Sequence, residues 1–196
     1  MIPILVTPST GDLISCQAMK EWLKGDVDET ADDDLIRALI ETAHRKYEAY
    51  TNVALLTQTY RIVLDDAPCD SWMRVKPSPL VSVVSIKGYT DTDGSDSSGG
   101  TAMSSSDYFV DTAHTPGRIV AIGGATWPTA TRSANAFIVE YTAGYSSDSS
   151  GVPEQAKTEI KHLVARAYEH RGDAVAVNTA IDELLRESDV AMPEWG

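Results

Sequence analysis

Side chains that could bind a metal ion are most concentrated in the acidic, serine-rich stretch YTDTDGSDSSGGTAMSSSDY. Asp91, Asp93 and Asp96 follow one another there at the short spacing found in calcium-binding loops. Such a loop needs glycine at its sixth position and a bidentate glutamate at its twelfth. Here glycine comes at the fourth position and alanine at the twelfth. The stretch therefore predicts a long, mobile loop at 90–105 that becomes ordered against a neighbouring protein, without a metal.

Histidines provide no second candidate for metal binding or catalysis. His162 and His170 are eight positions apart on one predicted helix, so they lie about 80° apart around its axis and two turns along it, too far to share one ion. His44 and His114 have no partner at a fixed spacing. No nucleophile elbow, phosphate-binding loop, dinucleotide-binding loop or H-E-x-x-H motif occurs. The sequence predicts no catalytic residue, no metal site and no cofactor.

Composition indicates a folded domain with an acidic surface. The chain has 196 residues, of which 42% are hydrophobic, and its formal net charge is −13, from 29 acidic and 16 basic residues. Such a surface repels nucleic acid phosphates, because there is no basic cluster to release counterions. Cys16 and Cys69 are too isolated to predict a disulfide framework or a zinc site, and we expect both to be buried or half-buried.

The first residues, MIPILVTPSTGD, predict no membrane attachment. Their apolar run is too short to span a bilayer, and it lacks the basic flank of a signal peptide. We therefore expect synthesis in the cytoplasm.

Helical periodicity predicts about four helices. The first ends at Gly25. The second spans 34–52, and Asp32, Asp33 and Asp34 at its start are expected to cap free amide groups. The other two predicted helices span 153–171 and 178–187.

Strand periodicity replaces helical periodicity from residue 57 onwards. We expect a mainly antiparallel sheet of about five or six strands, inserted between the helices. The strand-like segments are QTYRIVLD, WMRVK, LVSVVSIKGY, DYFVD, GRIVAI and AFIVEYTAGY.

The predicted fold class is α+β, with a small helical bundle and an inserted antiparallel β-sheet region in one structural domain. The predicted parts are N-terminal helices at 1–56, the β region at 57–145, C-terminal helices at 146–187 and an extended tail at 188–196. Met192, Pro193 and Trp195 lie in that tail outside any amphipathic pattern, and we expect them to dock on another chain.

Several segments, taken in order, resemble the head-tail connector family of tailed bacteriophages, also called head-completion or adaptor proteins. The order and spacing of the segments carry this resemblance, which covers roughly residues 12–172. They are DDDLIRALIETAHRKYEAYTN before ALLTQTYRIVLD, then RVKPSPLVSVVSIKGY, SSDYFVDTAHTPGRIVAIGGATWP, and FIVEYTAGY before VPEQAKTEIKHLVARAYEHRG.

The resemblance implies a structural virion protein with no catalytic activity. Such a protein forms a ring of about a dozen copies beneath the portal in the virion neck, extends the DNA channel and docks the stopper or tail. Double-stranded DNA then passes through the lumen without specific binding. The long helices are expected to supply contacts between copies, through Tyr47, Tyr50 and Tyr168.

Two alternatives stay open at this point. One is another phage neck or tail-completion protein with a similar plan. The other is a small hydrolase or carbohydrate-binding domain that uses aromatic side chains of the sheet, although these residues fit a core position better. The aromatic residues concerned are Trp72, Tyr89, Tyr108 and Trp127.

Overall fold

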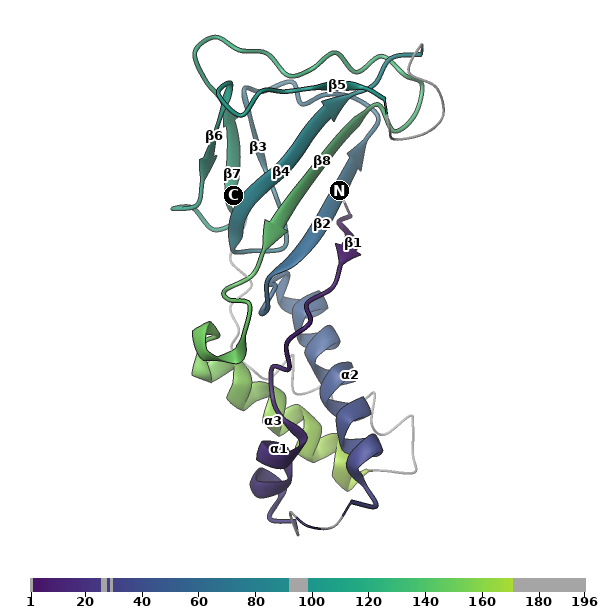
Figure 1. Ribbon diagram of the computed structural model, residues 1–196, viewed down its shortest axis with the longest axis vertical. Coiled ribbons are helices and arrows are strands. Elements are labelled where there is room, and N and C mark those ends of the chain that lie inside the picture. The colour runs from purple at the N-terminus through teal and green to yellow at the C-terminus, as the bar shows by residue number, and fades with distance from the viewer. Residues whose placement is uncertain (1, 26–27, 29, 92–98, 171–196) are drawn as a thin grey trace. The chain divides into compact units, whose positions relative to one another are not determined.

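A computed structural model describes residues 2–25, 28, 30–91 and 99–170 of the chain. These residues fall into two compact units (Figure 1). The β unit comprises Met1–Thr10 and Leu56–Ser147, and the helical unit comprises Gly11–Leu55 and Asp148–Gly196. The chain therefore passes between the units three times, after residues 10, 55 and 147.

The β unit contains a five-stranded and a three-stranded sheet, both built from antiparallel ladders. The larger sheet has the order β1-β2-β8-β4-β5 and the smaller one β3-β7-β6. The larger sheet's strands are β1 (Ile4–Thr7), β2 (Gln58–Leu64), β8 (Phe137–Ala143), β4 (Leu80–Gly88) and β5 (Thr101–Ala102). The smaller sheet's strands are β3 (Trp72–Arg74), β7 (Arg118–Ala121) and β6 (Tyr108–Asp111).

Each sheet buries one face, because alternate side chains along a strand point to opposite sides. In the larger sheet Tyr60 stacks on Tyr141 across the β2–β8 pair, with ring centroids 6.0 Å apart. The sheets meet where the Tyr141 hydroxyl donates to the Lys76 carbonyl and where Leu80 packs against Gly117. The buried side chains of these faces are Tyr60, Ile62, Met73, Leu80, Ile86, Ile119, Phe137, Val139 and Tyr141.

Two irregularities in β4 place apolar side chains on the opposite, solvent-facing side. Leu80 lies opposite Ala143 and Ser82 opposite Thr142, so Val81 is an extra residue in the ladder. Val84 is extra in the same way, and the two valines are 47% and 55% exposed. Over this stretch β4 pairs with β8, whereas β5 pairs with β4 only at Lys87 and Gly88.

All six predicted strand segments are strands in the structure, which confirms the antiparallel β region. The expected single sheet is wrong, because the described residues form two sheets. β1 and β5 were not predicted. Strand periodicity identifies strands one at a time, whereas partners such as Gln58 and Ala143 lie far apart in the sequence.

The helical unit contains α1 (Cys16–Leu23), α2 (Asp33–Thr51) and α3 (Glu154–Glu169), which pack on one another. Ser15 caps α1 by accepting a hydrogen bond from the Ala18 amide at 3.1 Å. Lys24 and Asn52 end α1 and α2 in the left-handed conformation. Three α-helices in the described residues confirm three of the predicted four, and the fourth, 178–187, lies outside the described residues.

Asp32 is the N-cap residue of α2, and its side chain makes no capping hydrogen bond, so the expectation that it caps free amide groups is wrong. Asp33 and Asp34 lie in the first turn of α2. Asp32 accepts a 2.5 Å hydrogen bond from the Tyr168 hydroxyl of α3. Asp33 forms an ion pair with Lys20 of α1, whose side chain is only 7% exposed. The Lys20 ammonium lowers the pKa of Asp33. This cluster ties all three helices together at one end of α2.

Candidate assembly surfaces

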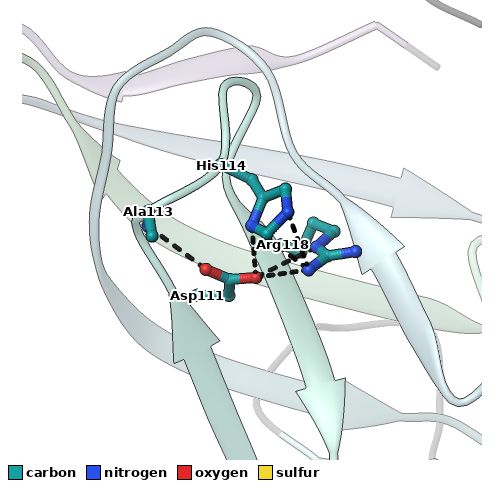
Figure 2. A network of polar contacts seen from close by, with 4 residues as sticks. All are labelled: Asp111, Ala113, His114 and Arg118. Carbon is teal, nitrogen blue, oxygen red and sulfur yellow. Dashed lines mark hydrogen bonds and ion pairs between the residues drawn. The ribbon is translucent and has the colours of Figure 1, made fainter.

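The β6–β7 hairpin carries a cluster of polar contacts (Figure 2). Asp111 ends β6, Arg118 begins β7, and His114 lies in the turn between them. Arg118 donates to one Asp111 oxygen, Oδ2, from Nε at 3.1 Å and from Nη2 at 2.6 Å. The other oxygen accepts from the Ala113 amide at 3.2 Å. The carboxylate therefore ties both ends of the turn together.

Hydrogen bonds to its charged form stabilise the Asp111 carboxylate. The Arg118 guanidinium is the largest cause, followed by His114 and the Ala113 amide, and together they lower the pKa of Asp111 to about 2 against the opposing effect of burial. The carboxylate is thus ionised throughout the physiological pH range.

His114 is held between an anion and a cation. Its Nδ1 lies 2.8 Å from Asp111 Oδ2, so a proton on Nδ1 donates to the carboxylate. Arg118 Nη2 lies 3.2 Å from Nδ1 and 3.3 Å from Nε2. A guanidinium so close to both ring nitrogens opposes binding of a metal cation by this imidazole. The contacts of this cluster therefore stabilise the hairpin, and they do not favour metal binding.

Opposite pairs across the small sheet place the cluster on its solvent-facing side. Trp72, Val120 and Phe109 form one row across the three strands. Arg74, Arg118 and Asp111 form the next row on the same side. The Arg74 guanidinium lies 5.2 Å from the centre of the Trp72 ring, and that of Arg118 lies 5.9 Å from it. We call these six residues the arginine–aromatic face.

This face has the composition of a protein–protein contact. Phe109 is 58% exposed, Trp72 is half-buried and Arg74 is exposed. Tryptophan and arginine are enriched among residues that dominate binding energy at interfaces. A sheet face of this kind gives a partner both an apolar anchor and a positive charge.

The edge of the larger sheet is a second apolar surface. Ile4, Leu5 and Val6 of β1 are 53%, 48% and 42% exposed, and Ile2 just before them is 84% exposed. Ile4 lies opposite Arg61 and Leu5 opposite Tyr60, so these two side chains point to opposite faces of the sheet. Among the described residues β1 pairs with β2 alone. An apolar edge of this kind favours pairing with another strand.

The structure places the three tyrosines expected at contacts between copies in the helical unit. Tyr47 is buried there, with 6% of its surface exposed, while Tyr50 and Tyr168 are half-buried. Tyr168 uses its hydroxyl within the chain, on Asp32. Their role in contacts between copies stays a prediction.

Most of the residues expected in a partner-ordered loop or a docking tail lie outside the described residues. Asp91 is described, and it is an exposed turn residue. The residues of this group outside the described part are Asp93, Asp96, Met192, Pro193 and Trp195.

The four aromatic residues that could have formed a carbohydrate-binding platform do not share one face. Tyr89 is buried, with 1% exposed, and Trp127 packs edge-on against Phe137. Trp72 belongs to the arginine–aromatic face, whereas Tyr108 lies one residue from Phe109 and points to the other side of β6. The arrangement gives no support to the sugar-binding alternative.

Two further features bear on function. Within the described ranges, no group of three or more His, Cys, Asp or Glu side chains is placed to hold a metal ion. No helix in the described part of the chain combines the length and apolar character needed to cross a membrane.

The fold is shared with chains from gene transfer agent particles. A chain from the neck of an empty particle, computed with C6 symmetry, has a TM-score of 0.74 and 20% identity, covering 94% of this chain and 95% of that one. A chain from the virion of a native particle has a TM-score of 0.72 and 19% identity, covering 94% and 95%. A chain from the neck of a native particle, computed with C12 symmetry, has a TM-score of 0.71 and 19% identity, covering 94% of each. No protein-family model and no curated protein sequence matches the chain.

Sequence reasoning missed both apolar surfaces. The six residues of the arginine–aromatic face come together only because β3, β7 and β6 pair, and periodicity in the sequence does not predict which strands pair. The Asp111–Arg118 pair left a usable signal, because opposite charges flank a short turn that contains Pro116 and Gly117. The β1 edge left a weaker one, the three-residue apolar run Ile4, Leu5 and Val6 between Pro3 and Pro8.

Proposed function

We propose that the chain is a structural neck protein of a phage-like particle, and more specifically a head-tail connector. Similarity to neck chains over 94% of this chain is the observation that carries the proposal, because it includes both units and their connections. In this role, copies form a ring beneath the portal, extend the DNA channel and dock the stopper or tail. The role requires no catalytic step.

A closed ring requires two different, complementary surfaces on every copy, because each copy contacts two neighbours in a head-to-tail manner. The β unit supports this requirement with two separate apolar surfaces, the arginine–aromatic face and the β1 edge. The similar neck chains come from particles computed with C6 and C12 symmetry, which agrees with a ring of about twelve copies.

The net charge of −13 fits a channel that conducts double-stranded DNA. A basic lining would hold the phosphates in place, whereas an acidic lining lets the duplex slide. We therefore expect carboxylates to outnumber basic side chains on the wall of the lumen. A ring whose bore is lined by lysine and arginine would contradict this part of the proposal.

The tail, 188–196, is proposed to dock on the portal, with Met192 and Trp195 as apolar anchors. Removal of residues 188–196 is expected to weaken portal binding at least about tenfold, because the anchors of the contact are lost. Unchanged portal binding by the truncated chain would contradict this assignment.

Native mass spectrometry over a concentration series tests the proposed function. The chain is measured alone and with the portal protein of the same particle. We expect monomers or small oligomers when dilute, and a ring of about twelve copies when concentrated or bound to portal. A chain that stays monomeric in all these conditions would contradict the proposal.

A further inference from the structure

We propose that β1 of one copy pairs with the open edge of β6 in the next copy, so that neighbouring sheets join edge to edge around the ring. This inference rests on the proposed function and names the contact that closes the assembly. Strand addition of this kind combines backbone hydrogen bonds with side-chain contacts on both faces of the sheet.

The ladder pattern shows which backbone groups of β6 face outward. The Ala121 amide donates to Ser71, away from β6, whereas the Ile122 amide donates to Asp107. Backbone groups of successive residues in a strand point to alternate sides. Tyr108 lies opposite Ala121 and Val110 opposite Ile119. The N–H and C=O groups of Tyr108 and Val110 therefore lie along the open edge of β6.

Both ends of β6 are fixed within its own hairpin. Asp107, just before the strand, accepts from the Ile122 amide at 3.0 Å. Asp111, its last residue, is held by the Arg118 guanidinium. A partner strand would meet an edge that is already extended and ordered, which lowers the entropy cost of binding.

The two strands suit one another in length and in side chains. β1 and β6 each have four residues, while β5 and β3, the outermost strands at the other ends of the two sheets, have two and three. Both carry exposed apolar side chains, with Phe109 at 58% on β6 and Ile4 at 53% and Leu5 at 48% on β1. Pairing them buries exposed apolar side chains, and it also joins backbone groups of two edges that have no strand partner in the described part of the chain.

Because β1 and β6 are different edges of the same unit, a contact between them is head-to-tail, as a closed ring requires. Each copy offers β1 to one neighbour and β6 to the other, so every copy uses both edges once when the ring closes. Pairing of β1 with β1 would instead join two copies about a two-fold axis and end there.

Hydrogen exchange of the assembled full chain, compared with the monomer, tests the contact directly. Peptides that contain residues 4–7 and 108–111 are expected to exchange at least about tenfold more slowly in the ring, because their edge amides become hydrogen-bonded. A peptide that contains 137–143 serves as control, since β8 is already paired on both sides. Rings that form without protection of the two edge strands would overturn the inference and leave the proposed function standing.

Charged substitutions provide the second test. Leu5→Lys and Phe109→Lys are each expected to reduce the fraction of chain in rings at least about tenfold, because a lysine on an edge strand opposes pairing. Val84→Lys is the matched control, since Val84 is also apolar and 55% exposed but lies in β4, which takes no part in the proposed contact. Thermal melting shows whether each variant is folded. Loss of rings in Leu5→Lys but not in Phe109→Lys would show that β6 is not the partner of β1 and would overturn the inference, and so would equal loss in Val84→Lys.

Discussion

The hydroxyl of Tyr168 donates a 2.5 Å hydrogen bond to the Asp32 carboxylate, 136 positions earlier in the sequence. Tyr168 lies near the end of α3, and Asp32 stands at the beginning of α2. The contact joins the two long helices where Lys20 and Asp33 also join α1 to α2. The helical unit is therefore closed at this end by polar contacts, in addition to its apolar core.

Tyr168→Phe removes that hydrogen bond and keeps the aromatic side chain. A hydrogen bond to a charged group contributes about 1.5–3 kcal/mol, so the free energy of unfolding should fall by about that amount. Tyr50→Phe is the matched control, because Tyr50 is also half-buried in the helical unit. Urea unfolding measures both variants. Equal stability of the two would show that the Tyr168 contact contributes nothing.

The Asp111 carboxylate predicts a pH-dependent contribution to stability. Its pKa is about 2 in the folded chain and 3.8 ordinarily, so its ionised form favours the folded state. The full stabilisation is present at pH values above the ordinary pKa of 3.8, and it is lost as the pH falls from there towards the folded-state pKa of about 2. Asp111→Asn should melt at a lower temperature than the unmodified chain at pH 6, and the difference should shrink as pH approaches 2.

Thermal melting across this pH range checks the prediction. Glu41→Gln is a suitable control, because Glu41 pairs with Arg45 on an exposed helix surface where ion pairs contribute little. A pH-independent difference between Asp111→Asn and the unmodified chain would contradict the proposed origin of the stabilisation.

Gly117→Ala is expected to destabilise the β unit. A Cβ atom at this position would lie 2.4 Å from the Leu80 Cβ, so the two sheets would have to move apart there. Such overpacking costs about 1–3 kcal/mol. Gly25→Ala is the control, because its Cβ would meet only an ordinary contact at 3.7 Å. If chemical denaturation shows equal stabilities, the close approach of Leu80 does not constrain this position.

Local patterns predicted the individual elements well. Alternation of Tyr60, Ile62 and Leu64 identified β2, and the apolar repeat that contains Ile36, Ile40 and Ala43 identified α2. Both patterns arise because one face of the element is buried. β1 escaped prediction because all four of its residues are exposed, so no alternation marks it.

The tertiary arrangement was less accessible, since it depends on partners distant in sequence. The alternation in β6 does not reveal that β7 and β3 form a separate sheet with it, and so the row of Trp72, Val120 and Phe109 could not be predicted. The cap prediction for Asp32 was wrong for a related reason, which also applies to Asp33 in the first turn of α2. Lys20 and Tyr168 approach them only after the three helices have packed.

Electron cryomicroscopy of the chain bound to its portal tests the central claim most directly. A neck protein of the proposed kind should give a closed ring of about twelve copies, coaxial with the portal, around an open channel. Density for isolated or irregularly placed copies, with no continuous channel beneath the portal, would contradict the proposal.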